Sequence, residues 1–195
     1  MKLQTFYYLP ENTHAGAKAM MFVDGENLAI RFGQILGENS EQPHVVFERN
    51  VYVWTRFANI RGHTACEIVR RHFYTSVQGD DPKLSTVEDA LKDVGIEAPR
   101  VFKKEKGKPA KRVDIQLTTE MLGHAHRSNY DIAILVAGDE DYAPLVEAVQ
   151  REGKRVVLWF FENGLSPKLV RIVDYAFDIS RFFFTDEPTL ARYFV

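Results

Sequence analysis

Two groups of acidic residues each follow a short apolar run, and this arrangement is the clearest chemical signal in the sequence. Asp24 follows the run Met20–Val23, and Asp139 and Asp141 follow the run Ile132–Val136. Short apolar runs bounded by turn residues are typical of buried strands. In an open α/β sheet, ligands bind just beyond the carboxyl ends of such strands. Because carboxylates gathered there would repel one another, the pattern predicts a divalent cation between them.

A further acidic position, Asp114, lies at the start of a predicted helix. Its neighbours at i+3, i+4 and i+7 are Leu117, Thr118 and Met121, which places all four on one helix face. We therefore expect the Asp114 carboxylate to face the sheet and to join the other acids. Carboxylate oxygens suit Mg²⁺ or Mn²⁺, ions that polarise a phosphoryl oxygen and lower the pKa of a bound water.

Each acidic residue also has an ordinary structural explanation. Asp24 precedes Gly25 and could open a turn, while Asp114 could be a first-turn acid favoured by the helix dipole. Asp139 or Asp141 could be the N-cap of the following helix. Convergence distinguishes the two explanations, because a cation site requires these carboxylates to share one pocket.

Strands alternate with helices along the chain, which predicts βαβ units and a mainly parallel sheet covered by helices on both faces. The predicted strands are Met20–Val23, Cys66–Val77, Arg100–Lys103, Asp131–Ala137 and Arg155–Phe160. The predicted helices are Glu26–Leu36, a helix with a Ser85/Glu88 capping box that ends before Gly95, Val113–Ala125, Tyr142–Glu152, and a helix opened by Ser166 and Pro167.

Two segments do not follow this alternation. Residues 1–19 are mixed in character, and we expect an accessory lead-in before one domain over 20–195. Residues 37–66 could form strands or a helix-containing insertion. At the C-terminal end, Phe182–Phe184 is expected to close the apolar core, with the interface of a homodimer as the alternative.

Composition favours a globular protein in a reducing compartment. Of the 195 residues, 45% are apolar and 27% are charged, which is ordinary for a single soluble domain. The single cysteine, Cys66, cannot form an internal disulfide, and no signal peptide or membrane-length apolar stretch is apparent. We therefore expect a cytoplasmic protein that does not insert into membranes. The formal charge of −2 lacks the basic excess usual for nucleic-acid binding, although it does not exclude local patches.

Three motifs in this order resemble those of the NYN domain family, a branch of the PIN-like nucleases that includes LabA-type proteins. The matching segments are Phe22–Leu28, Lys111–Ile115 and Ala137–Val146, followed by Gly153–Val156. Arg112 stands where the family's middle motif has glycine. Ala137, Glu140 and Tyr142 also differ from the commonest residues, but every acidic position matches. The resemblance covers about residues 20–184.

The resemblance implies a Rossmann-like, PIN-type three-layer α/β/α fold and a metal-dependent ribonuclease that hydrolyses RNA phosphodiester bonds. By matching position, Asp24, Asp114, Asp139 and Asp141 would form the Mg²⁺ or Mn²⁺ site. Asn27 would contact either a water on the metal or the substrate. Glu26 and Glu140 are expected to face outward or to lie outside the direct ligands, and no general base beyond an activated water is required.

Basic residues precede Asp114 and could guide RNA into the acidic site. The segment from Lys103 to Arg112 is predicted to be a basic loop, and Lys111 and Arg112 are the strongest candidates for substrate binding because they adjoin Asp114. A solvated loop without RNA contacts is the alternative. His124 and His126 are expected to form an exposed pair, because residues at i and i+2 do not share a helix face.

Two other functions are compatible with parts of this pattern. One is a non-catalytic RNA-binding or regulatory module, although a relic pocket would not require all four aspartates. The other is a phosphohydrolase of the haloacid-dehalogenase type, which also places an aspartate after its first strand. That family requires a second aspartate where this chain has Glu26, and it leaves the segment Lys111–Asp114 unexplained.

Overall fold

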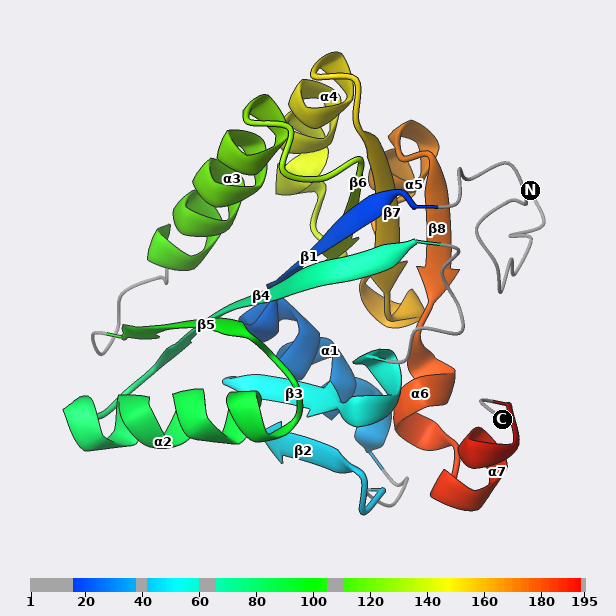
Figure 1. Cartoon of the computed structure of the whole chain (residues 1–195). Helices are drawn as coiled ribbons and strands as arrows, with labels where there is room; N and C mark the ends of the chain where they lie inside the picture. The colour runs from blue at the N-terminus through cyan, green and yellow to red at the C-terminus, as the bar shows by residue number, and fades with distance from the viewer. Residues whose placement is uncertain (1–15, 38–41, 60–65, 105–110, 194–195) are drawn as a thin grey trace.

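A six-stranded sheet with the strand order β5-β4-β1-β6-β7-β8 lies at the centre of the molecule, and every pairing within it is parallel (Figure 1). The computed structural model describes residues 16–37, 42–59, 66–104 and 111–193. The strands of this sheet are β1 (Lys18–Asp24), β4 (Glu67–Val77), β5 (Ala98–Lys103), β6 (Ile132–Val136), β7 (Arg155–Phe160) and β8 (Tyr175–Asp178).

Helices cover both faces of this sheet. They are α1 (Gly25–Leu36), α2 (Asp81–Asp93), α3 (Lys111–His126), α4 (Ala143–Arg151), α5 (Pro167–Ile172), α6 (Ser180–Phe184) and α7 (Glu187–Tyr193). Figure 1 shows α3 and α4 on one side of the sheet and α1 and α2 on the other. The short 3₁₀ helices are η1 (Arg56–Asn59), η3 (Glu140–Tyr142) and η4 (Glu162–Gly164).

Strand β1 supplies both layers of the core because successive side chains on a strand point to opposite faces. Met21 and Val23 belong to the cluster on the α1 side, whereas Met20 and Phe22 belong to the cluster on the α3 side. The predicted three-layer α/β/α arrangement with a parallel sheet is therefore confirmed.

The parallel register brings the predicted acidic positions to one edge of the sheet. Within β1, Val23 lies opposite Val136 of β6 on one side and Phe73 of β4 on the other. Asp24 is the next residue along β1, and Asp139 follows the end of β6 by a short turn. Strand pairing alone thus places both aspartates beyond neighbouring carboxyl ends.

The described part of residues 37–66 forms a two-stranded antiparallel hairpin and η1. Strand β2 (Val45–Glu48) pairs with β3 (Tyr52–Thr55). Val53 and Trp54 are fully buried in the α1-side core, so the hairpin is part of the main fold. The strand interpretation is correct for these residues.

Helix α2 begins four residues before the predicted capping box. The Asp80 carboxylate accepts a hydrogen bond from the Lys83 backbone N–H at 3.2 Å, and Pro82 lies in the first turn. Ser85 is therefore inside the helix. The predicted start was wrong because the Asp80 N-cap followed by Pro82 is already a complete helix start, ahead of the Ser85/Glu88 pair.

The predicted basic loop is shorter than expected at its C-terminal end. Lys111 and Arg112 belong to the first turn of α3, while residues 105–110 lie outside the described residues. The C-terminal apolar segment behaves as predicted, because Phe182 and Phe183 of α6 are buried in the core. A homodimer stays a prediction.

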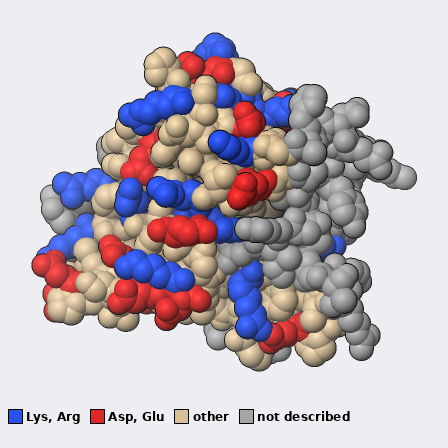
Figure 2. Space-filling view, viewed as in Figure 1, with Lys and Arg blue, Asp and Glu red and all other residues tan. Residues whose placement is uncertain are grey.

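No helix among the described residues is long and apolar enough to cross a membrane. Charged side chains of both signs cover the face shown in Figure 2, with Lys and Arg interspersed among Asp and Glu. Charge sign alone therefore does not distinguish a binding surface on this face.

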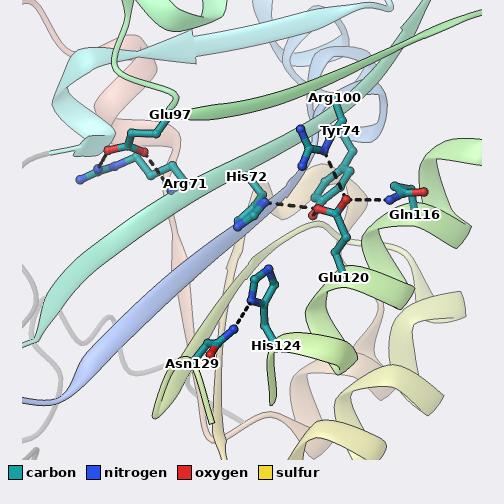
Figure 3. Close-up of polar contacts among 9 residues, drawn as sticks. All are labelled: Arg71, His72, Tyr74, Glu97, Arg100, Gln116, Glu120, His124 and Asn129. Carbon is teal, nitrogen blue, oxygen red and sulfur yellow. Dashed lines mark hydrogen bonds and ion pairs between the residues drawn. The ribbon is translucent and has the colours of Figure 1, made fainter. Parts of the chain in front are cut away.

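A polar cluster lies between α3 and strands β4 and β5 (Figure 3). The Glu120 carboxylate accepts hydrogen bonds from the Tyr74 hydroxyl at 2.7 Å, from Gln116 Nε2 at 2.6 Å and from Arg100 Nε at 3.2 Å. The cluster thus ties α3 to two strands through one carboxylate.

His72 belongs to this cluster and is almost completely buried, at 2% exposure. Its ring stacks against those of Phe22 and Tyr74, and its Nδ1 lies 3.4 Å from Glu120 Oε2. His124 is half-buried and close to the His72 ring, so the expected exposed pair of histidines is wrong for His124. His124 of α3 therefore packs against the rings of Phe22 on β1 and His72 on β4.

Burial lowers the pKa of His72 from 6.5 to about 4, because it penalises the charged ring. Glu120 opposes this shift, while the positive charges of His124, Arg100 and Arg70 add to it. His72 is therefore neutral in the folded protein at neutral pH.

We predict that His72 makes the fold acid-sensitive between about pH 6.5 and pH 4. As the pH falls through this range, the unfolded chain takes up the proton first, and the free energy of unfolding decreases by on the order of 3 kcal/mol. His72→Phe keeps a stacking ring without a titrating group and should flatten this part of the pH profile. Urea denaturation at several pH values measures the effect. The exposed His126→Gln variant is the control, and parallel profiles for wild type and His72→Phe would contradict the assignment.

Candidate active site

Asp24 has two structural roles at the end of β1. Its Oδ1 accepts a hydrogen bond from the Asn27 backbone N–H at 3.0 Å, which caps α1. The side chain is only 5% exposed, so the carboxylate lies inside the protein. Asp24 therefore caps a helix rather than opening a turn, and the cap accounts for only one of the two carboxylate oxygens.

The second oxygen of Asp24 meets the hydroxyl group of Tyr142. This hydroxyl donates to Asp24 Oδ2 at 2.9 Å and lies 3.3 Å from Asp114 Oδ1. Asp114 is an exposed residue on the first turn of α3, but its carboxylate faces inward to this hydroxyl, which agrees with the expected orientation. Carboxylates from β1 and α3 therefore converge on one tyrosine hydroxyl.

Asp139 and Asp141 complete the acidic group from the turn after β6. Both are exposed, and Asp139 Oδ1 accepts a hydrogen bond from the Asp141 backbone N–H at 3.2 Å, which makes Asp139 the N-cap of η3. Burial raises the pKa of Asp114, and the negative charges of Asp139, Glu26 and Asp141 raise it further, against the opposing Tyr142 hydrogen bond. Asp139 and Asp141 thus act electrostatically on Asp114, which meets Asp24 at Tyr142, while one site shared by all four aspartates stays a prediction.

A close backbone approach fixes the turn that carries Asp139. A Cβ atom on Gly138 would overlap the carbonyl oxygen of Gly164, and the Ser166 N–H donates to the Gly138 carbonyl at 3.0 Å. Only glycine fits here, because a backbone carbonyl cannot move aside as a flexible side chain can. The position of Asp139 therefore depends on contacts between two loops.

Burial raises the pKa of Asp24 from 3.8 to about 7. The hydrogen bonds from the Asn27 backbone and Tyr142 oppose this shift, and the charges of Asp114 and Glu26 add to it. Burial and the negative charges of Asp24 and Asp114 raise the pKa of the Tyr142 hydroxyl, which keeps it protonated and able to donate.

The carboxylate oxygens of the site suit a hard divalent cation, but the distances between the carboxylates limit how many of them could bind it. Among the described residues, no three His, Cys, Asp or Glu side chains lie close enough together to hold a metal ion. Mg²⁺, however, commonly binds through one or two carboxylates and keeps several waters until substrate phosphate adds its oxygens. The Asp24 and Asp114 pair meets that requirement, and the buried Asp24 carboxylate gains most from a nearby positive charge.

Glu26 and Glu140 have partners that explain them without a ligand. Glu26 accepts a hydrogen bond from the Ser76 hydroxyl at 2.9 Å and forms an ion pair with Lys104. Glu140 pairs with Lys168 at 3.1 Å on the exposed side of the turn. Both contacts agree with the expectation that these glutamates lie outside the direct ligand set.

The predicted substrate-binding residues are close to the aspartates in sequence but have few contacts of their own. Asn27 is half-buried, and its backbone N–H, rather than its side chain, contacts Asp24. Arg112 is exposed at the start of α3, beside Asp114, and the Lys111 side chain lies outside the described residues. Their roles toward RNA stay predictions.

Tyr142 is the site residue that the sequence did not identify. It appeared only as a departure from the commonest residue at its motif position. The available signal was a hydroxyl group directly after Asp141, at a position whose burial in the structure is nearly complete. A buried tyrosine usually has a hydrogen-bond partner. The sequence alone does not show that the partners of Tyr142 are Asp24 and Asp114, because both are distant along the chain.

A model of the NYN domain matches residues 18–180. The chain belongs to the NYN domain family. NYN domains are usually nuclease-like, which supports a hydrolase of the nuclease class for this member. PIN-like nuclease domains usually use divalent metals. The family match therefore does not support the alternative of a haloacid-dehalogenase-type phosphohydrolase.

Structural comparison agrees with this fold. A protein of unknown function from Vibrio parahaemolyticus, known from a crystal structure, superposes with a TM-score of 0.63 at 22% identity. The likeness covers 88% of this NYN chain and 98% of the other, and at that identity it shows the fold alone. A search of curated proteins found no match.

We predict that Asp24→Asn stabilises the NYN domain when a chelator is present. Asparagine can still cap α1, but it avoids ionising a buried group. The wild-type contribution is complete below pH 3.8 and is lost as the pH rises through about 7, a difference on the order of 4 kcal/mol. The variant should therefore exceed wild type in urea denaturation at pH 8 and approach it near pH 4. The exposed Asp141→Asn is the control, and equal stabilities at pH 8 would argue against a strained Asp24 carboxylate.

Proposed function

We propose that this NYN domain is a metal-dependent ribonuclease that hydrolyses RNA phosphodiester bonds at the aspartate site. The observation that carries the proposal is the meeting of Asp24 and Asp114 at the Tyr142 hydroxyl, inside a family of nuclease-like domains. A buried carboxylate with a pKa near 7 has a free-energy cost that a purely structural cap would not require. A cation bound beside it would offset that cost.

In this proposal, Asp24 and Asp114 hold Mg²⁺ or Mn²⁺, and Asp139 and Asp141 add negative charge at the open side. When bound, the ion supplies positive charge to the phosphodiester and makes a water molecule more acidic. The Tyr142 hydroxyl orients the two holding carboxylates by its hydrogen bonds. The α1 cap fixes the remaining Asp24 oxygen, so the buried side of the site is preorganised.

Asn27, Lys111 and Arg112 are the proposed substrate contacts. Arg112 lies two residues before Asp114 on the exposed start of α3, where a phosphate entering the site would pass. Arginine suits this role because its planar guanidinium binds phosphate through paired hydrogen bonds.

A non-catalytic RNA-binding or regulatory module is the second candidate. The observation in its favour is that no three acidic or His/Cys side chains of the described residues lie at metal-holding distance. Such a module would bind RNA without turnover, which the same experiment detects.

We predict that the full-length protein cleaves labelled RNA with Mn²⁺ or Mg²⁺ and not with a chelator. Asp139→Asn should reduce the rate by about a hundredfold or more, the scale of losing one charge-stabilising group. Single-stranded and structured RNAs are tested in parallel by gel electrophoresis. Mn²⁺ should also raise the wild-type melting temperature, because ligand that binds only the folded state stabilises it.

Glu140→Gln is the matched control, since Glu140 lies beside Asp139 in sequence but pairs with Lys168. It should retain wild-type activity. Equal cleavage by wild type and Asp139→Asn would identify a contaminating nuclease. RNA binding without turnover would favour the regulatory module, and faster hydrolysis of a small phosphate ester would point to a phosphohydrolase.

A further inference from the structure

One side of strand β5 is left uncovered by helices in the described structure. It is the edge strand of the sheet, and α2 packs against its other face, while α3 lies over β1 and β4. Arg100 and Phe102 project on the α3-facing side, where Arg100 contacts Glu120 and Phe102 packs on the α3-side core. Arg100 therefore borders α3, the helix whose first turn carries Asp114 (Figure 3 shows Arg100 beside Glu120).

Ion-pair partners distinguish the basic residues in this region. Arg71 donates from its backbone N–H and from Nη1 to the Glu97 carboxylate, at 2.9 and 2.7 Å. Lys104 is paired with Glu26. These two positive charges are compensated within the protein, so they are poor candidates for binding an anion.

Arg100 is oriented differently. It uses only Nε toward Glu120, at 3.2 Å, and its side chain is 47% exposed. Glu120 is itself fixed by Tyr74 and Gln116, so the guanidinium is held at one edge (Figure 3). Its terminal amino groups have no partner among the described residues. A guanidinium held in this way is preorganised for a phosphate, because little side-chain entropy remains to be lost.

Two further arginines extend the same side toward the C-terminal end of α3. The β1–β4 register pairs Met20 with Arg70 and Phe22 with His72, which places Arg70 on the α3-facing side. Arg127 directly follows α3, and the charges of both arginines reach His124. Both are exposed, and neither forms an ion pair within the described chain.

We propose that single-stranded RNA lies along the border between α3 and the uncovered side of β5, with its phosphates on Arg100, Arg70 and Arg127 and its cleaved bond at the aspartates. The identity of the ligand rests on the proposed function. Asp114 and Arg127 mark the two ends of α3, whose 16 residues span about 24 Å, enough for several nucleotides. A narrow line of positive charges follows one strand, whereas a duplex is recognised across its groove.

The contacts predict binding without sequence preference. Arginine–phosphate contacts carry no base information, and Phe102, which is half-buried, is the one aromatic side chain identified beside this line for a base to touch. Affinity should therefore fall steeply with salt and differ little between sequences of equal length.

Fluorescence anisotropy with labelled single-stranded RNA, in a chelator to prevent cleavage, tests this path. Arg100→Gln in the full chain should weaken binding by about tenfold at low salt. It should also reduce the slope of log affinity against log salt by about 0.7, the value for one phosphate contact on a single strand. Arg70→Gln and Arg127→Gln should each reduce the slope similarly. Neither residue contacts Glu120 in the described structure, so these two variants test the path even if Arg100→Gln impairs folding.

Arg171→Gln is the matched control, an exposed arginine on α5 that carries the same charge change elsewhere. It should leave affinity and slope unchanged. Equal effects of Arg100→Gln and Arg171→Gln, tighter binding of a duplex of the same length, or no RNA binding by wild type would each overturn the path. Binding along the path without cleavage would sustain this inference and reject the nuclease. RNA cleavage combined with an affinity that none of the three arginine substitutions changes would support the nuclease and reject the path.

Discussion

The Tyr142 hydroxyl is the contact on which the candidate site depends, because it joins carboxylates from two elements that are distant in sequence. Without it, the buried Asp24 carboxylate would have only the α1 cap to stabilise its charge beside Asp114, and its pKa would rise further. Burial removes water from the Asp24 carboxylate, so the Tyr142 hydroxyl takes the place of a water as hydrogen-bond donor. The same desolvation that raises the pKa of Asp24 keeps the tyrosine protonated and donating. The pocket is therefore organised before any cation or substrate arrives.

This organisation has a thermodynamic consequence for the whole fold. A protein gains nothing in stability by burying Asp24 in a form that resists ionisation, and an asparagine would cap α1 about as well. Free energy lost at a buried charged group commonly marks a position whose constraint is functional. The surrounding sheet compensates for it: β1 lies between β4 and β6, and Phe22 and Val23 are completely buried on either face. The site thus sits where the fold is most strongly packed.

Local patterns in the sequence predicted the elements well, and tertiary contacts explain most of what they missed. Strand β7 has the predicted bounds, and the Ser166 cap and Pro167 start α5 as expected, because periodicity and caps depend on adjacent residues. The family and the parallel three-layer fold could also be predicted. The role of Tyr142 and the grouping of His72 around Glu120 could not be predicted. Tyr142 depends on the approach of β1 to α3, and the His72 group depends on the approach of β4 to α3. Helix periodicity gave the inward orientation of the Asp114 carboxylate, but it did not show that the residue itself is exposed.

The distribution of charge explains how a chain with a formal net charge of −2 can still have a surface suited to a polyanion. Several basic residues are already neutralised in pairs, such as Arg71 with Glu97 and Lys104 with Glu26. Two groups of charge lie near α3: the aspartates at its N-terminal end, and Arg100, Arg70 and Arg127 along its side, of which Arg100 is ion-paired through Nε alone. A phosphate backbone would be attracted to the arginines and repelled at the aspartates unless a cation were present there. Under this arrangement, an RNA strand could bind along α3 in the absence of metal, but it could occupy the acidic end only together with an ion. Binding and chemistry would then differ in their metal requirement, because opposite charges control the two parts of one continuous surface.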